Sequence, residues 1–217
     1  MDFAAARRNM VESQIRTNRV TDARIVAALG EIPRELFVGE DRAGIAYVDE
    51  ALSLGPGRYL MEPMAFAMLL QAAEIGGDDV VLDIGCATGY SSAVLARLAG
   101  TVVGLEEDAG FAARATELLG ELKIDNVAVM EGALTDGHAG QAPYDAIIFS
   151  GAAADVPDAI IGQLADGGRL VFIEASDDGV GRGYVIGKYG ESVSRRHIFD
   201  AGSPLLPGFE PVAAFSF

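Results

Sequence analysis

The chain has 217 residues and a mass of 22.6 kDa, which suits one α/β domain with an appendage better than two full domains. Half of the residues are hydrophobic and 22% are charged, so the composition excludes a disordered chain. The 16 Lys and Arg residues against 32 Asp and Glu residues give a net charge of −16, which repels phosphate groups and anionic lipids. We therefore expect neither nucleic acid nor a membrane as a partner.

Cysteine usage and the start of the chain bear on location. The single cysteine, Cys86, excludes a disulfide framework and a cysteine zinc cluster, and we predict no metal site. The first eight residues lack the apolar stretch of a signal peptide. These features predict a cytoplasmic protein.

The first 75 residues predict short helices followed by a loop. Thr21 and Asp22 offer an N-cap for a helix over 23–29, and Pro33 marks another start. A Gly-Pro-Gly segment at 55–57 begins a loop that reaches residue 62. Pro63 then opens an almost wholly apolar helix over 64–75, which must be buried. We expect residues 1–75 to form a helical cap and substrate loop that are integral to the fold.

From residue 79 onward, short apolar runs alternate with amphipathic segments. Strands are predicted at 80–84, 102–105, 127–130, 146–149 and 170–173, and helices at 91–98, 111–119 and 157–164. This alternation is typical of a mostly parallel, doubly wound sheet with helices on both faces. Segments 184–188 and 192–199 predict an antiparallel hairpin, and 212–217 predicts one more strand. Residues 76–217 thus form the predicted cofactor-binding core of a single domain.

The turn after the first core strand carries the main functional signal. Gly85 and Gly89 allow the backbone to approach a ligand closely, and the following helix directs its first N–H groups at it. Glu106 ends the next strand 21 residues after Gly85, close to the ~20-residue interval at which an acid meets ribose hydroxyls. The pattern therefore predicts a nucleoside-containing ligand.

Asp83, at the end of the same strand, narrows the choice of ligand. A dinucleotide site prefers three glycines and no carboxylate beside the pyrophosphate, so a nicotinamide-dependent oxidoreductase is disfavoured. S-adenosylmethionine carries an ammonium and a sulfonium, which Asp83 can attract directly or through water. Cys86, inside the turn, is interpreted as a packing residue rather than a nucleophile.

With these residues in view, the chain resembles the protein-L-isoaspartate O-methyltransferase family from its first helix to roughly residue 200. The matching segments are 32–38 (IPRELFV), 46–47, 83–90 with 93–96, 142–145 and 163–170. The resemblance implies a Rossmann-like class I methyltransferase with a seven-stranded sheet. It also implies S-adenosyl-L-methionine as the cofactor, S-adenosyl-L-homocysteine as the product, and the free carboxylate of an isoaspartyl residue in a damaged protein or peptide as the acceptor.

The turn and the resemblance together give a set of candidate residues. The candidate cofactor residues are Asp83, Gly85, Cys86, Ala87, Gly89, Tyr90, Glu106, Glu107, Gly132 and Ala133. The candidate substrate residues are Arg58, Leu60, Met61, Glu62 and Ser150. An ionised carboxylate is already a nucleophile at neutral pH, so few catalytic side chains are expected.

The chain departs from the family where the acceptor is expected to bind. The family's Ile-Ser-Gln-Pro is Leu-Met-Glu-Pro at 60–63, so Met61 replaces the serine usually assigned to the active site, and no catalytic residue is assigned. Glu62 either repels an acceptor carboxylate or caps the helix that begins at Pro63. Arg58 is either a carboxylate-binding residue or a solvated loop arginine. The family's Gly-Asp-Gly turn is also altered, to Gly132-Ala133-Leu134.

Two hypotheses follow from these departures. The first is isoaspartyl methylation, with activity that we expect to be weak or absent. The alternative is an S-adenosylmethionine-binding homologue with a different acceptor or no catalysis.

Overall fold

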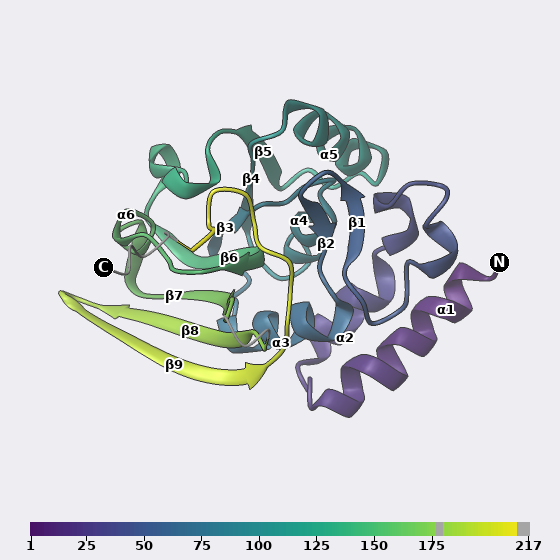
Figure 1. Ribbon diagram of the computed structural model, residues 1–217, viewed down its shortest axis with the longest axis horizontal. Helices are drawn as coiled ribbons and strands as arrows, with labels where there is room; N and C mark the ends of the chain where they lie inside the picture. Colours follow the sequence, from purple (N-terminus) through teal and green to yellow (C-terminus); the bar gives the residue numbers. More distant parts are fainter. Residues whose placement is uncertain (177–179, 212–217) are drawn as a thin grey trace, which may run out of the picture.

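A seven-stranded sheet runs through the centre of the molecule (Figure 1). The computed structural model describes residues 1–176 and 180–211. The strands are β3 (Val80–Ile84), β4 (Thr101–Glu106), β5 (Val127–Glu131), β6 (Tyr144–Ala153), β7 (Leu164–Glu174), β8 (Arg182–Tyr189) and β9 (Ser192–Asp200), in the spatial order β5-β4-β3-β6-β7-β8-β9. The five strands from β3 to β7 are parallel to one another, and β8 pairs antiparallel with β7 and β9. The predicted doubly wound sheet and its antiparallel hairpin are confirmed, whereas the strand predicted at 212–217 lies outside the described residues.

Helices occupy the connections. They are α1 (Phe3–Met10), α2 (Ala23–Glu31), α3 (Pro63–Ala73), α4 (Tyr90–Leu95), α5 (Ala109–Glu121) and α6 (Asp158–Ile161), with shorter helical turns η1 (Val11–Ile15), η2 (Arg16–Asn18), η3 (Arg34–Phe37), η4 (Ala43–Ile45), η5 (Leu134–Asp136) and η6 (Ala139–Gln141). The helix predicted over 157–164 is shorter than expected because Leu164 already belongs to β7.

None of the helices in residues 1–176 and 180–211 combines the length and the apolar character needed to cross a bilayer.

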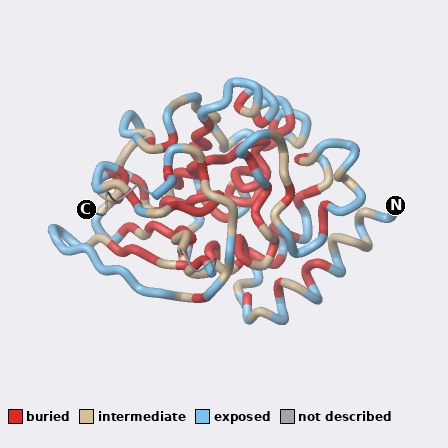
Figure 2. The backbone as a smooth tube through the Cα atoms, viewed as in Figure 1, coloured by how far each residue is buried: buried red, intermediate tan, exposed pale blue. Residues whose placement is uncertain are grey.

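The sheet separates two apolar layers because side chains alternate along each strand. Val81 packs on the face covered by α3, α4 and α5, whereas Leu82 and Ile84 pack on the face covered by α6. In Figure 2 the middle of the sheet is buried, and the outer strand β9 is largely exposed. The central strands are therefore shielded on both faces, as their continuous apolar runs predicted.

The N-terminal segments pack onto the same core as the first face of the sheet. The Asp22 side chain accepts a hydrogen bond of 2.8 Å from the Arg24 amide, which confirms the predicted cap of α2. Helix α3 begins at Pro63 as predicted and lies buried against β6 and β7. Its capping acid is Asp49, which accepts a hydrogen bond of 3.0 Å from the Met64 amide.

The segment predicted as a loop over 55–62 is partly a strand. Strands β1 (Leu52–Gly55) and β2 (Arg58–Leu60) form an antiparallel hairpin, with Gly57 at φ 68° in the turn. The loop prediction was wrong for residues 58–60 because glycine and proline mark the turn, whereas the strands on either side are too short to show a pattern.

Candidate active site

The glycine turn lies at the carboxyl edge of the sheet, where the strand order reverses. Strand β3 lies between β4 and β6, so the chain leaves β3 for one side and later returns to the other. Ligands of open α/β sheets bind at such a topological switch point. Gly85 and Gly89 have φ angles of 81° and 92°, left-handed conformations that glycine adopts without strain. Ser150 of β6 lines the same pocket as Gly85, as predicted.

Asp83 is completely buried, and hydroxyl groups surround its carboxylate. Ser91 and Ser92 donate to Oδ2 and Ser150 donates to Oδ1, each at 2.6 Å. Burial raises the pKa of Asp83, and the three hydrogen bonds oppose that rise. Asp83 therefore joins β3, α4 and β6, and the hydroxyls of Ser91 and Ser150 stand between its carboxylate and the pocket that they line.

Glu106 is held in one orientation by backbone amides. The Ala87 amide donates to its Oε2 at 2.7 Å, and the amides of Glu107 and Asp108 donate to its Oε1 at 3.1 and 3.2 Å. The Glu106 side chain is fully buried. The glycine turn and the end of β4 thus fix a carboxylate at the switch point, where the sequence predicted a group for ribose hydroxyls.

Arg58, the first residue of β2, is the fourth donor to Glu106. Its Nη2 lies 2.5 Å from Oε2 of Glu106, and both side chains are buried. The alternative that Arg58 is a solvated loop residue was therefore wrong. A charge-assisted pair of this kind ties the β1–β2 hairpin to the end of β4.

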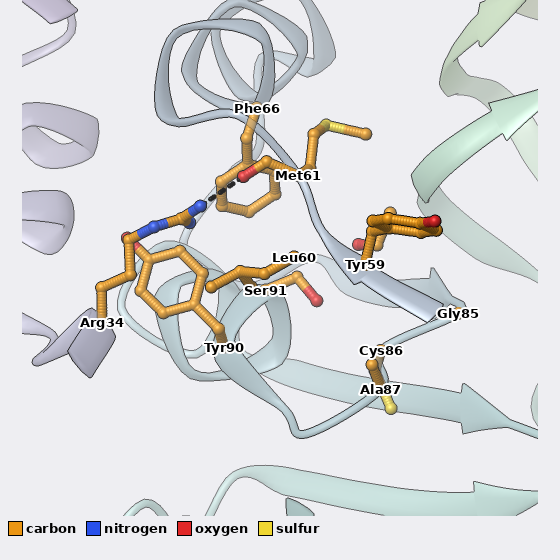
Figure 3. A pocket seen from close by; sticks show the side chains of 11 residues that line it. Arg34, Tyr59, Leu60, Met61, Phe66, Gly85, Cys86, Ala87, Tyr90 and Ser91 are labelled. Carbon is orange, nitrogen blue, oxygen red and sulfur yellow. Dashed lines mark hydrogen bonds between the residues drawn. The ribbon is translucent and has the colours of Figure 1, made fainter. Parts of the chain in front are cut away.

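A cavity of about 10 Å³ lies between β2, the glycine turn and α4 (Figure 3). The residues that line it are Arg34, Tyr59, Leu60, Met61, Phe66, Gly85, Cys86, Ala87, Tyr90, Ser91 and Ser150. Its volume is enough for about one water molecule. The structure thus brings the predicted substrate residues Leu60, Met61 and Ser150 to the glycine turn.

Arg34 binds backbone carbonyls on two segments next to this pocket. Its Nε donates to the Ala46 carbonyl at 2.7 Å, and its Nη2 donates to the Met61 carbonyl at 2.6 Å (Figure 3). The guanidinium carbon lies 4.9 Å from the centre of the Tyr90 ring. Arg34 therefore fixes the position of the residue that replaces the family's serine.

Met61 and Glu62, which stand where the family has serine and glutamine, both differ from those residues in what they offer the pocket. The Met61 side chain is buried and lines the pocket, so it supplies an apolar surface where a hydroxyl was expected. Glu62 makes no side-chain hydrogen bond to the start of α3, so the alternative that its carboxylate caps the helix was wrong. Burial raises the pKa of Glu62, with the charge of Asp49 acting in the same direction.

The segment after β9 closes the site from the other side. In Figure 1 this segment, in yellow, runs from the end of β9 to β6. The Ala152 amide donates to the Pro204 carbonyl at 2.9 Å, and the Leu206 amide donates to the Ala152 carbonyl at 2.8 Å. A Cβ atom built on Gly85 would lie 2.6 Å from Cδ2 of Leu206 and 3.3 Å from Nη2 of Arg58. Leu206 and Arg58 therefore cover the face of the glycine turn.

The remaining predicted residues take different places. Burial raises the pKa of the Cys86 thiol well above its usual value, which agrees with a packing role. The Tyr90 ring packs against Phe37 and Phe66, and its centre lies 5.6 Å from the Phe37 ring centre and 6.1 Å from the Phe66 ring centre.

The two other predicted segments lie beside Glu106. The Gly132 amide donates to the Glu106 carbonyl at 3.0 Å, which brings the Gly132–Ala133 turn next to the end of β4. Glu107 is exposed.

Sequence reasoning missed several residues of this site, among them Arg34, Tyr59, Phe66, Ser91, Ser92 and Leu206. The two serines stand at the start of the helix after Asp83, so their spacing could have signalled a buried carboxylate network. Arg34 belongs to the segment 32–38 but was not assigned to the site. Leu206 had no local signal, because only the packing of the segment after β9 brings it to Gly85.

The sequence of this chain is similar to those of known proteins from one family. A family model described as Protein-L-isoaspartate(D-aspartate) O-methyltransferase matches residues 5–178. Protein-L-isoaspartate O-methyltransferase from Methanoculleus marisnigri is 41% identical over 165 residues, which are 76% of this chain and 75% of that protein. Protein-L-isoaspartate O-methyltransferase 2 from Anaeromyxobacter sp. is 37% identical over 195 residues, which are 88% of this chain and 79% of that protein.

Two solved structures share the fold. A protein-L-isoaspartate O-methyltransferase has a TM-score of 0.82 at 24% identity and covers 93% of this chain and 66% of its own. A putative protein-L-isoaspartate O-methyltransferase from Plasmodium falciparum, in complex with S-adenosyl-L-homocysteine, has a TM-score of 0.77 at 19% identity and covers 92% of this chain and 97% of its own.

The seven-stranded sheet, the glycine turn after β3 and the acid at the end of β4 are the fold of class I methyltransferases. Within that class, the family model and the relatives above 30% identity decide the matter: the chain belongs to the protein-L-isoaspartate O-methyltransferase family.

Proposed function

We propose that this protein transfers a methyl group from S-adenosyl-L-methionine to the free carboxylate of isoaspartyl residues in proteins or peptides. The observation that carries the proposal is the family match over residues 5–178, together with a buried Glu106 beside the glycine turn. The two curated relatives described above carry the name of this activity. The product would be S-adenosyl-L-homocysteine.

The donor set beside the glycine turn suits this cofactor in its chemistry. Glu106 offers a carboxylate for the ribose hydroxyls, and Gly85 has no side chain of its own to keep a ligand from its backbone. The space in front of Gly85 is occupied, however, because the side chains of Leu206 and Arg58 lie against it. Cofactor binding therefore requires both side chains to withdraw. Asp83 would act on the ammonium through its electric field, since its carboxylate is completely buried beneath the three serine hydroxyls that it accepts.

The cofactor supplies an electrophilic methyl group, and the chain has to place the acceptor in line with it. When bound, the cofactor would supply this methyl group to the carboxylate oxygen and would keep the electron pair of the broken carbon–sulfur bond on sulfur, so the residues of this chain would have no proton to move. The residues around the pocket consequently need to position and to exclude water rather than to act as a base. Leu60, Met61 and Phe66 provide an apolar wall for this purpose.

Two cations lie close to the expected acceptor position. Arg34 holds the Met61 carbonyl, and Arg58 precedes the pocket-lining residues Tyr59 and Leu60 on β2. Arginine binds a carboxylate through two parallel hydrogen bonds, which compensates for the hydroxyl that Met61 lacks. We assign Arg58 to the acceptor because Arg34 is held by two backbone carbonyls, whereas the Arg58–Glu106 pair lies on the face of Gly85 that cofactor binding has to clear.

Methyl transfer to a synthetic peptide tests the proposal. S-adenosylmethionine with a labelled methyl group is incubated with the protein and an isoaspartyl peptide, and the same peptide with a normal aspartyl residue is the control. Label that appears only on the isoaspartyl peptide and is released by mild base as a methyl ester supports the proposal. Equal labelling of both peptides, or of neither, contradicts it.

The proposal includes the setting of the reaction. The single cysteine supports a cytoplasmic location, and the charge of −16 argues against nucleic acid or a membrane as a partner. The family membership supports a protein or peptide as the partner. We also keep the division into a cap and substrate loop over 1–75 and a cofactor-binding core over 76–217. Cell fractionation tests the location.

A further inference from the structure

Arg58 has hydrogen-bonding capacity that its present partner does not use. Its Nη2 donates to Glu106, but its Nε is buried and meets no acceptor among the residues that the structure describes. A buried donor without an acceptor is unfavourable, because it has lost water and gained nothing. The guanidinium therefore has one nitrogen bonded to Glu106 and another that is buried without a partner.

Glu106 has no acceptor position to spare while Arg58 is present. A carboxylate offers about four lone-pair sites. The amides of Ala87, Glu107 and Asp108 take three of them, and Arg58 takes the fourth. The three amides belong to the backbone around the site, so Arg58 is the donor that can leave. A ribose hydroxyl that binds Glu106 has to replace it.

Arg58 also occupies space next to Gly85 that a ligand at the glycine turn would need. A Cβ built on Gly85 would lie 3.3 Å from its Nη2, and Leu206 fills the rest of that face. The cavity that remains nearby is about 10 Å³. A ligand that approaches the backbone at Gly85 and the guanidinium of Arg58 thus exclude one another.

The side chain that leaves Glu106 starts from a strand that leads to the acceptor. Arg58 opens β2, and the next three residues of the chain, Tyr59, Leu60 and Met61, all line the pocket beside the glycine turn. Met61 offers no hydrogen-bond donor from its side chain, and the Ser150 hydroxyl is committed to Asp83. Once it is free, Arg58 is a cation with unused donors beside the pocket, available to an anionic acceptor group.

We propose that Arg58 exchanges partners during the reaction: it pairs with Glu106 until the ribose of the cofactor takes its place, and it then binds the acceptor carboxylate. The acceptor half of this exchange rests on the proposed function. The exchange makes Arg58 a specificity-determining residue with opposite effects on the two ligands. It weakens cofactor binding and strengthens acceptor binding, and it orders them, with the cofactor first.

The test compares Arg58→Gln with Arg97→Gln, which removes the same charge from a surface pair with Glu31. Calorimetry with S-adenosyl-L-homocysteine measures the cofactor site without any acceptor. We expect Arg58→Gln to bind it about tenfold more tightly than the unmodified protein, since the competing group is gone, and Arg97→Gln to bind it unchanged. Leu206→Ala, which leaves the ion pair intact, is expected to tighten binding as well.

Steady-state kinetics with the isoaspartyl peptide measure the acceptor half. The KM for the peptide is expected to rise about tenfold in Arg58→Gln, although the same variant holds the cofactor more tightly. A residue with a merely structural role would weaken both ligands together. If Arg58→Gln does not fold, Arg58→Lys replaces it, because Lys keeps the charge but lacks the planar fork.

The outcomes separate the two proposals. Unchanged or weaker binding of S-adenosyl-L-homocysteine in folded Arg58→Gln and in Leu206→Ala overturns the exchange. Tighter cofactor binding with an unchanged peptide KM overturns its acceptor half. Absence of methyl transfer from every variant and from the unmodified protein overturns the proposed function, whereas tighter cofactor binding in those variants would still support the competition at Glu106.

Discussion

The Ser150 hydroxyl donates a hydrogen bond of 2.6 Å to Oδ1 of Asp83, and it joins β6 to β3 at the carboxyl edge of the sheet. The two residues are 67 positions apart in the chain, and both are buried. With Ser91 and Ser92 on the other carboxylate oxygen, this bond completes a network that stabilises a buried charge. The network lies directly beneath the glycine turn.

Ser150→Ala is expected to lower the free energy of unfolding by about 1–3 kcal/mol, because Asp83 loses a donor in a buried place. Urea denaturation measures the loss. The exposed Ser13, which donates to a helix carbonyl, provides the control Ser13→Ala, for which little change is expected. A loss of equal size in both variants would contradict the network.

The same variant gives a pH dependence with a definite sign. Burial already raises the pKa of Asp83 above the ordinary value of 3.8, and Ser150 is the strongest of the groups that oppose the rise. Without Ser150 the folded-state pKa rises further, so the ionised form becomes less favourable in the folded protein. The stability deficit of Ser150→Ala should therefore be constant at low pH and grow as the pH rises from the folded-state pKa of Asp83 in the unmodified protein, which lies above 3.8, to its higher pKa in the variant. Denaturation curves from pH 3 to pH 7 check this, and a deficit that does not vary with pH argues against it.

The ion pair between Arg58 and Glu106 is expected to behave as one unit. Glu106→Gln leaves the Arg58 guanidinium buried without its counter-charge and should cost about 3–5 kcal/mol of stability. The double variant with Arg58→Gln should lose less than the sum of the two single variants. A denaturation cycle of the four proteins measures the coupling. The surface pair of Arg114 and Glu117 is the matched comparison, with a coupling below about 1 kcal/mol.

Glu106→Ala also tests the assignment of Glu106 to the ribose. The variant should bind S-adenosyl-L-homocysteine more weakly by about 1.5–3 kcal/mol, because charge-assisted hydrogen bonds are lost. Calorimetry on protein whose folding has been verified by circular dichroism gives the value. Unchanged affinity would remove the ribose assignment.

The β1–β2 hairpin and the residues that follow it are expected to cover the bound cofactor. Hydrogen exchange of the amides in residues 54–62 should slow down at saturating S-adenosylmethionine, because a ligand bound between this segment and the glycine turn would shield these amides. The exposed edge strand β9 serves as the internal control and should exchange at the same rate with and without ligand. Indifference of residues 54–62 would count against a cover.

Restoring the family's residues at the pocket is expected to raise isoaspartyl methylation. Met61→Ser with Glu62→Gln returns a hydroxyl and removes a carboxyl group that would repel an acceptor carboxylate by about 4 kcal/mol at 4 Å for an effective dielectric constant of 20. The raised pKa of Glu62 reduces this repulsion at the acid end of the range, so the gain should increase with pH. Robust, isoaspartate-selective turnover by the unmodified protein, unimproved by the double variant, would show that Arg58 and backbone donors suffice.

The sequence by itself determined the sheet, the turn and the family. The apolar run 80–84 became β3 because a fully buried parallel strand needs hydrophobic side chains on both faces. Gly85, Gly89 and Glu106 could be placed from spacing alone, because a strand, a tight turn and a helix fix where the next strand ends. The capping role of Asp22 and the start of α3 at Pro63 could also be predicted, because both depend only on neighbouring residues in the chain.

Only the tertiary structure decided what these residues contact. Arg58 meets Glu106 across 48 positions of the chain, and Leu206 reaches Gly85 from the segment after β9. Neither contact has a local pattern, because each depends on how the β1–β2 hairpin and that segment pack at the edge of the sheet. The sequence places charges and glycines at intervals along the chain, whereas the packing of distant segments decides which charge is paired and which glycine is covered.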